Sequence, residues 1–368
     1  MQKRTTRSIS EMLTVHQRPT NIAGSLKYRC RASYSCAHTL IMGFLLLSNL
    51  SILMAQDALW KRSLDEGTKF QEQGNYAKAE KAYLTAVAEA KRLGPEDQAT
   101  AESLTTVATF YRDMGRYSEA EPIYRRVVSI QKRVFGPEHP AVAVSLNNWA
   151  LLTRLQGQLS EAESMYLQAI AIDERILGPD HLEVGTGLNN LASVYQDEHR
   201  DSEAESLYQR ALDIKEKALG TEHLDVAAIL NNLASLYSSR GNFERAEPLY
   251  RRSLAIREKV LGENHPVTAT VLHNLGSLCQ KQHRYEEAET LYLQALAIRE
   301  RTLGPDHPYV AETLRAYASL LKETRRKSEA KAMNARAEKI MASSPAIRMS
   351  MQTVHVHDLE SKSLTSEK

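Results

Sequence analysis

The chain has 368 residues, and its 47 Lys and Arg nearly balance its 45 Asp and Glu, for a formal net charge of +2. This balance argues against a general nucleic-acid binder, because such proteins carry a clustered excess of positive charge. Only three cysteines occur, Cys30, Cys36 and Cys279, which excludes a disulfide framework and a cysteine-based zinc site.

The first 62 residues lack the repeated sequence motifs, although the first helix pair is predicted to begin at about residue 57, and they start with a basic stretch. Residues 1–38 hold seven Lys and Arg against the single acidic residue Glu11, and we expect them to form a disordered leader. Residues 39–56 form a hydrophobic segment that we interpret as a signal or an anchor. Its apolar run, residues 40–54, is shorter than the roughly 20 residues that a membrane-spanning helix needs.

A basic lead before a short apolar run is typical of an export signal or of an N-terminal membrane anchor. We therefore expect the protein to be exported, to the periplasm or the cell exterior, or to be anchored in a membrane through residues 40–54. A cytoplasmic location is the alternative, and the sequence does not decide whether residues 40–54 are cleaved.

From residue 94 onward the chain repeats itself with a constant period of 42 residues. The period is marked by six glycines: Gly94, Gly136, Gly178, Gly220, Gly262 and Gly304. A fixed period of this size predicts stacked copies of one small unit in place of a single globular core.

Each unit has the pattern of two amphipathic helices. Apolar residues spaced three and four apart define a first helix over residues 267–282 and a second over residues 286–302. A polar break separates the two helices, and in several copies it contains a glycine that tolerates the left-handed backbone at a helix end. Recurring Glu-Ala-Glu strings in the second helix, such as Glu161 to Glu163, indicate a solvated face.

The repeats fill residues 57–340, as six full helix pairs of the 42-residue type followed by a closing pair. The Ala and Tyr columns of the second helix begin with a spacing of 41, from Ala79 to Ala120 and from Tyr83 to Tyr124, so the first copy lacks one residue there. We expect residues 341–368 to form a disordered tail because they show little periodicity.

Leu-Ala or Leu-Gly in the first helix, Gly-x-Tyr at the turn, and Ala then Tyr in the second helix resemble the tetratricopeptide repeat. The 42-residue length and the strings Leu-Asn-Asn-Leu-Ala, Ala-Ile-Arg-Glu and Leu-Gly-x-x-His-Pro resemble the repeats of the kinesin light chain family and its bacterial look-alikes. This resemblance implies an all-α fold, a right-handed superhelical solenoid. Residues 1–62 show no coiled-coil heptad, which favours a bacterial relative over a motor subunit.

The resemblance also implies that the first helices line a concave groove, where asparagines and basic residues hold short peptide segments with aromatic and acidic residues. A side-chain amide suits an extended peptide because it offers both a donor and an acceptor. The alternative is that these amides bond the neighbouring helix, and the sequence does not decide which Asn of each pair faces the groove. The candidate groove residues are Asn147, Asn148, Asn189, Asn190, Asn231, Asn232, Asn274, Arg112, Arg154, Lys281, Arg315 and Lys322.

No catalytic motif, phosphate-binding loop or metal motif occurs in the sequence. Five histidines recur at one repeat position, but neighbouring units lie about 10 Å apart, too far for histidines to share an ion at a bond length of about 2 Å. We expect these histidines to bond the loop between repeats: His139, His181, His223, His265 and His307. The sequence thus predicts no enzyme activity, no cofactor, no metal and no small-molecule substrate.

The sequence predicts a non-enzymatic scaffold that binds an extended peptide segment of a partner protein in its concave groove. One alternative is a regulatory or sensor array that binds its partner through the convex face, where Arg251 and Arg252 lie. The other is nucleic-acid binding through the C-terminal basic cluster, which consists of Lys322, Arg325, Arg326, Lys327 and Lys331.

Overall fold

The structure is a computed structural model that describes residues 59–71 and 73–343. The predicted leader, the apolar segment and residues 344–368 of the predicted tail lie outside the described residues. Within the described part, every element is an α-helix, which confirms the all-α prediction. No helix there is both long and apolar enough to cross a bilayer.

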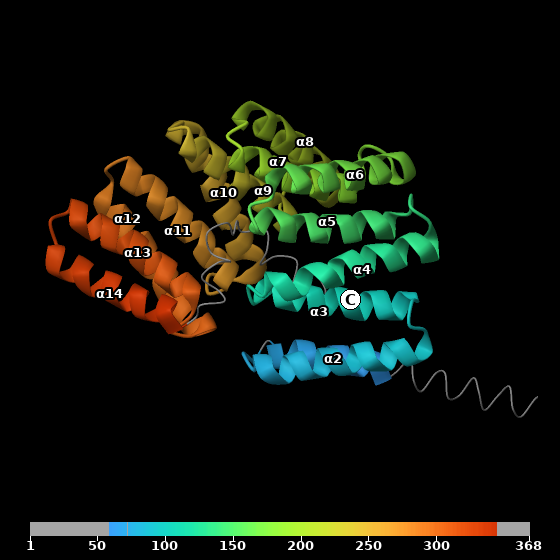
Figure 1. The fold of residues 1–368 in the computed structure, drawn as a ribbon. Helices are drawn as coiled ribbons and strands as arrows, with labels where there is room; N and C mark the ends of the chain where they lie inside the picture. Colours follow the sequence, from blue (N-terminus) through green and yellow to red (C-terminus); the bar gives the residue numbers. More distant parts are fainter. Residues whose placement is uncertain (1–58, 72, 344–368) are drawn as a thin grey trace, which may run out of the picture. The chain divides into compact units, whose positions relative to one another are not determined.

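The helices follow one another with short turns between them (Figure 1). Residues 59–71 are helical, and the helices that follow are α2 (Tyr76–Leu93), α3 (Gln98–Asp113), α4 (Tyr117–Phe135), α5 (Pro140–Leu155), α6 (Leu159–Leu177), α7 (Leu182–Asp197), α8 (Asp201–Leu219), α9 (Leu224–Ser239), α10 (Phe243–Leu261), α11 (Pro266–Lys281), α12 (Tyr285–Leu303), α13 (Pro308–Glu323) and α14 (Lys327–Ser343).

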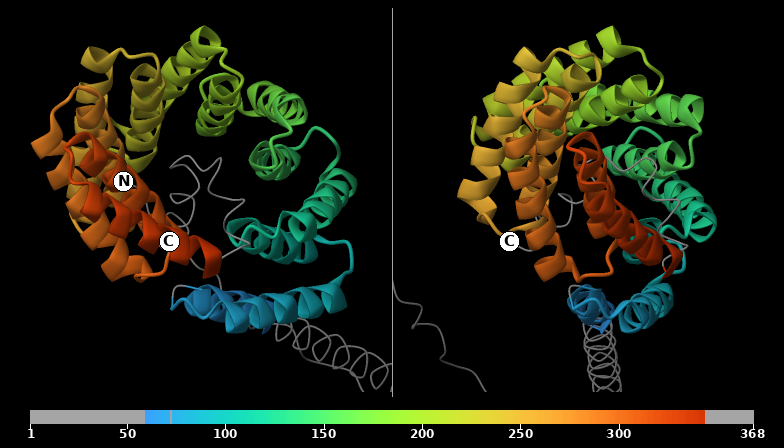
Figure 2. Two further views of the ribbon diagram at one scale, coloured as in Figure 1. Left: turned by 60° about the vertical axis from the view of Figure 1, so that its left-hand side comes forward. Right: turned by 90° about the vertical axis from the view of Figure 1, so that its left-hand side faces the viewer.

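Each odd-numbered helix is the first helix of a pair and packs against the even-numbered second helix that follows it. It also packs against the second helix of the preceding pair, so the pairs stack in chain order (Figure 2). First helices contact one another as well, from α3 to α5 and onward to α13. The first helices therefore form a continuous row along the stack.

Helix lengths repeat as closely as the sequence does. The first helices α3, α5, α7, α9, α11 and α13 each have 16 residues. The second helices from α4 to α12 have 19 residues, whereas α2 has 18. The shorter α2 confirms that the first copy lacks one residue in its second helix.

The backbone at both kinds of turn follows the glycine pattern. Within a pair, Gly115, Gly157 and Gly241 adopt φ of 70°, 79° and 72°, as predicted for a left-handed helix end. Between pairs, the five glycines from Gly136 to Gly304 combine φ of 85–95° with ψ of 154–162°. Only glycine adopts this second combination without strain, which explains the glycine at these five positions, whereas Gly94 has an extended backbone.

The recurring histidines begin the first helices. The Nδ1 atom of each ring accepts a hydrogen bond from the backbone N–H two residues later, as between His181 and Glu183 at 3.2 Å. The same bond occurs at His139, His223, His265 and His307. This satisfies one of the unpaired N–H groups at a helix start. The histidine side chains therefore cap the first turn of the helix that follows, whereas the sequence predicted that they bond the loop between repeats.

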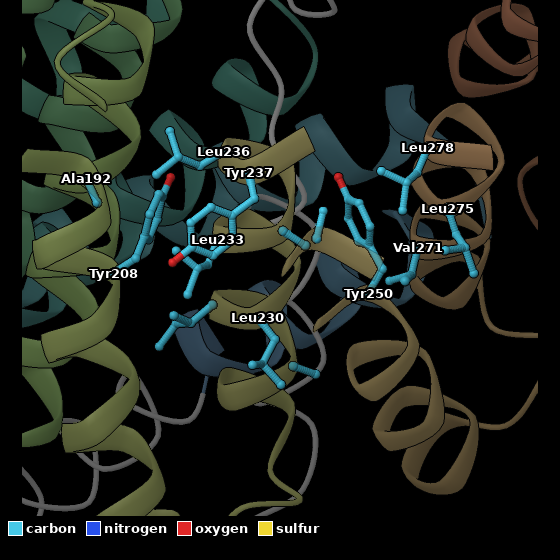
Figure 3. Close-up of a cluster of buried hydrophobic side chains, with 14 of the residues drawn as sticks. Ala192, Tyr208, Leu230, Leu233, Leu236, Tyr237, Tyr250, Val271, Leu275 and Leu278 are labelled. Atoms are coloured by element: carbon cyan, nitrogen blue, oxygen red, sulfur yellow. The ribbon is translucent and has the colours of Figure 1, made fainter. Parts of the chain in front are cut away.

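The core consists of the same residues repeated in every pair. The alanine and tyrosine columns of the second helices are almost completely buried, and each tyrosine removes about 150–250 Å² from water. Figure 3 shows Tyr208 against Leu233 of α9 and Tyr250 against Val271 and Leu275 of α11. Each second helix thereby inserts its tyrosine against the first helix of the next pair.

Candidate functional site

The candidate asparagines lie in the middle of α5, α7, α9 and α11, and they join each first helix to the next. In each bond, the second Asn of a pair donates from Nδ2 to Oδ1 of the first Asn on the preceding first helix, 43 residues earlier. The bonds run from Asn190 to Asn147 (3.2 Å), from Asn232 to Asn189 (3.2 Å) and from Asn274 to Asn231 (3.0 Å). We call this set the asparagine ladder.

The middle of the asparagine ladder is closed to solvent. Asn189, Asn190, Asn231 and Asn232 are only 1–5% exposed, and Asn189 also donates to Asn190 at 3.3 Å. Buried amides need such partners because an unpaired polar group is costly away from water. The bonding between neighbouring helices that the sequence left open therefore occurs at these four residues and also at Asn147 and Asn274, which stay partly exposed like the unbridged Asn148.

The ladder stops at α11 because the repeat changes there. The next acceptor position is occupied by His273 and the next donor position by Ala316. His273 is 9% exposed, and its Nδ1 has no partner in the described part of the chain. Burial lowers the pKa of His273 to about 4, so the ring is neutral at pH 7 and can accept a hydrogen bond at Nδ1.

Two of the five basic candidates lie inside the helix row. The side chain of Arg112 is 4% exposed, and its Nη2 is 3.0 Å from Oδ1 of Asp113. The side chain of Arg154 is 3% exposed, and its Nε donates to Oδ2 of Asp197 on α7 at 2.7 Å. Each guanidinium has a carboxylate partner within the protein, so neither presents a free positive charge at the surface.

The other three basic candidates are exposed and belong to the last two first helices. Lys281 lies at the end of α11, where its Nζ is 3.4 Å from Oγ of Ser238 on α9. Partial burial lowers the pKa of Lys281. Arg315 and Lys322 lie on α13. The exposed positive charge of the row is therefore concentrated at its C-terminal end.

A second set of contacts, which the sequence did not predict, links five of the six second helices from α2 to α12 to the turn of the next pair, α4 being the exception. A glutamate of the second helix forms an ion pair with an arginine from that turn. We call these contacts the glutamate clasp: Glu80 with Arg116, Glu163 with Arg200, Glu205 with Arg240, Glu247 with Arg284 and Glu289 with Arg326, at 2.6–3.0 Å.

Tyrosines strengthen the clasp in several copies. The hydroxyl of Tyr317 donates to Glu289 at 2.6 Å, which lowers the pKa of that carboxylate. Burial, and next this hydrogen bond, raise the pKa of Tyr317 to about 12. In another copy the guanidinium of Arg200 stacks 3.7 Å from the ring centre of Tyr195. Because Glu163 pairs with Arg200, only Glu161 of the Glu-Ala-Glu string at residues 161–163 is exposed to solvent.

One repeat position in the second helices holds a buried ionisable group whose type differs between the α6–α7 and α8–α9 interfaces. On α8, Nζ of Lys215 lies 2.6 Å from Oδ2 of Asp225 on α9. The equivalent residue of α6 is Asp173, which is 5% exposed and whose Oδ1 has no partner in the described residues. Burial, and next the nearby charge of Glu183 on α7, raise the pKa of Asp173 to about 6.

No cluster of three His, Cys, Asp or Glu side chains that could hold a metal occurs within the described ranges. In the C-terminal basic cluster, Arg326 pairs with Glu289 at 2.6 Å and with Glu329 at 2.7 Å. The remaining members, Lys322, Arg325, Lys327 and Lys331, are exposed.

Comparison with known proteins supports the repeat assignment. A tetratricopeptide repeat model matches residues 100–175, 145–217, 183–259, 225–300 and 267–343, and a second such model matches residues 67–91. No curated protein matches the chain.

Solved structures of similar proteins include BtubC (BKLC) from P. vanneervenii, with 26% identity over 66% of this chain and 92% of that chain and a TM-score of 0.49. A putative kinesin light chain of Podosopora anserina shares 29% identity over 55% of this chain and 95% of that chain, with a TM-score of 0.45. A Rap protein complexed with Competence and Sporulation Factor shares 13% identity over 79% of this chain and 76% of that chain, with a TM-score of 0.61, and so resembles it in fold alone.

Proposed function

We propose that this chain, which belongs to the tetratricopeptide repeat family, is a non-enzymatic protein-interaction scaffold that holds an extended segment of a partner protein along its row of first helices. The observation that carries the proposal is the continuity of that row, in which α3, α5, α7, α9, α11 and α13 contact one another in order. A row of this kind offers the same side-chain positions at regular intervals, as an extended chain requires.

The accessible side chains of the row are suited to a peptide backbone. Partly exposed amides and hydroxyls remain at Asn147, Asn148, Ser235, Asn274 and Ser277. These groups can both donate and accept hydrogen bonds, which matches the alternating N–H and C=O groups of an extended peptide. In this proposal the buried centre of the asparagine ladder fixes the helix spacing, and the partly exposed residues contact the peptide.

The charge distribution indicates how the peptide is oriented. Lys281, Arg315 and Lys322 are exposed at the C-terminal end of the row, whereas Arg112 and Arg154 are neutralised within it. Acidic residues of the partner segment therefore lie against α11 and α13. The preference for aromatic residues beside the acidic ones comes from the family resemblance and completes the expected motif.

A peptide array of acidic and aromatic segments, probed with the full chain, tests this proposal. We expect the double substitution Lys281→Ala with Arg315→Ala to weaken binding of the best peptides about tenfold, because hydrogen bonds to charged groups are lost. The matched control removes two arginines of a second helix, Arg251→Ala with Arg252→Ala, and leaves binding unchanged. If only the control variant loses binding, the partner occupies the convex face; if neither loses it, the proposal is wrong.

We also propose that the protein is exported or membrane-anchored through residues 40–54, on the basis of the basic lead and the apolar run. N-terminal sequencing of the mature protein tests this proposal. A new N-terminus near Ala55 supports export, whereas an intact N-terminus in the membrane fraction supports anchoring. An intact chain in the soluble cytoplasmic fraction contradicts both.

A further inference from the structure

The first helix of each pair packs on the second helix of the preceding pair, and the residues of that second helix in the contact are of the same types in every copy. On α12 this surface includes Glu289, Tyr292 and Leu296. Glu289 accepts a hydrogen bond from Tyr317 of α13 at 2.6 Å, and Leu296 packs in one cluster with Leu314 of α13. The same three residue types, acidic, tyrosine and aliphatic, recur 42 residues apart on the preceding second helices from α4 onward.

The last second helix of the described residues, α14, has other side chains at these positions. The residues 42 positions after Glu289, Tyr292 and Leu296 are Lys331, Asn334 and Glu338. They border a hollow of about 680 Å³ on the last helix pair. The hollow is lined by Lys322, Lys327, Lys331, Asn334, Ala335 and Glu338. We call this surface the end face. It lies where a following first helix would pack.

The end face is cationic. Three of its lining residues are lysines and one is a glutamate, for a net charge of +2. Lys322, Lys327 and Lys331 are exposed, and the structure records no ion pair for them within its described residues. Arg326, at the same turn, instead pairs with Glu289 and Glu329. The end face thus carries a positive charge, that of Lys331, at the position where α12 carries the clasp residue Glu289.

We propose that the end face docks a helix of a partner protein that carries carboxylates where the internal first helices carry tyrosine and arginine. Three features support this occupant: the preceding second helices each receive a helix on the same surface, a hollow remains at this one, and its free charges are positive. Another helix from this repeat family would bring a tyrosine and an arginine against Lys331, so the charge disfavours it. The end face is separate from the row proposed to hold the extended peptide.

Two labelled synthetic peptides test the proposal. One has the sequence of residues 308–327, and the other carries Tyr317→Glu and Arg326→Glu, which places carboxylates at the two clasp positions. Their binding to the full chain is measured by fluorescence anisotropy. We expect the acidic peptide to bind the wild-type chain about five- to tenfold more tightly, and Lys331→Glu to reverse the order. The matched control, Lys339→Glu, alters an exposed lysine of α14 outside the hollow and leaves the order unchanged.

The outcomes separate the possible roles of the end face. Absence of binding by both peptides means that the surface only solvates the end of the stack, and equal binding means that its charge is not recognised; either result overturns the proposal. Tighter binding of the unmodified peptide indicates self-association and also overturns it. The same holds if a 20-nucleotide RNA binds more tightly than the acidic peptide and loses its binding with Lys331→Glu. Circular dichroism verifies that each variant is folded.

Discussion

The substitution Asp173→Asn tests whether one interface in the stack is destabilised by a buried carboxylate. Asp173 lies between α6 and α7, where it faces Glu183, whereas the equivalent interface between α8 and α9 holds the pair of Lys215 and Asp225. Asp173 is 5% exposed and its Oδ1 has no partner in the described part of the chain, while asparagine has nearly the same shape without the charge. We expect the variant to be more stable than the wild type at pH 7.5.

The size of the effect follows from the pKa. The pKa of Asp173 is about 6 in the folded chain, and an aspartate in an unfolded chain has a value near 3.9. This difference of about two units corresponds to at most about 3 kcal/mol. Since the pKa of Asp173 is raised in the folded chain, the folded state is not penalised below pH 4, where the carboxyl group is protonated. This stability is lost as the pH rises through 6 and the buried carboxyl group ionises. The gain from the substitution is therefore largest at pH 7.5 and falls toward zero near pH 4.

Urea unfolding followed by circular dichroism at a series of pH values between 4 and 7.5 measures this difference. Other carboxylates also titrate in this range, so the quantity to compare is the stability of the variant minus that of the wild type. Hydrogen exchange at α6 and α7 shows whether the gain is local, because stacked repeats can open separately. The substitution Asp306→Asn, at an exposed aspartate, serves as the control. A gain for Asp173→Asn that is the same at every pH refutes the reasoning.

Three further substitutions probe the turns and the asparagine ladder. Gly220→Ala forces a side chain into a backbone with φ of 85° and ψ of 162°, so we expect a loss of about 1–3 kcal/mol in urea unfolding, and an unchanged midpoint contradicts this. His199→Gly relieves φ of 60° at a position that is Gly157 in the preceding copy, and thermal unfolding detects a gain of about 1 kcal/mol; a lower melting temperature contradicts this. Ala316→Asn extends the ladder, because the new amide can donate to Nδ1 of His273. We expect a gain of about 1 kcal/mol in stability and slower hydrogen exchange in α11 and α13. A destabilised variant means that the new amide does not reach the ring.

The sequence predicted the helix pairs and their turns because these depend on local chemistry. The shortened α2 and the left-handed glycines each follow from residues close together in the chain, whereas the capping role of the histidines was not predicted. The asparagine ladder shows what local patterns cannot reveal. Equal positions recur every 42 residues, but the bonded residues are 43 apart, because the geometry of stacking offsets neighbouring helices by one residue. That offset explains why the asparagines occur as adjacent pairs, such as Asn189 and Asn190.

How deeply each side chain of the first helices is buried was equally hard to predict from the sequence. An amphipathic pattern indicates which side of a helix faces its partner, but not how closely the next first helix covers the remaining side. Arg154 and Lys281 lie near the same end of their helices, yet the guanidinium of Arg154 reaches Asp197 inside the row and the ammonium group of Lys281 stays at its rim. The clasp of Glu163 with Arg200 was also missed, because the two residues lie on different repeats.

The offset of the asparagine ladder has an evolutionary consequence. Because every internal donor and acceptor is an asparagine, an in-frame deletion of residues 183–224 would leave Asn232 opposite Asn147, the same pairing in a shorter array. Duplication of those residues would be accommodated in the same way. Recombination can therefore lengthen or shorten this protein by whole units without any compensating mutation at the new junction in the ladder, so relatives with different numbers of repeats are expected to share the paired asparagines.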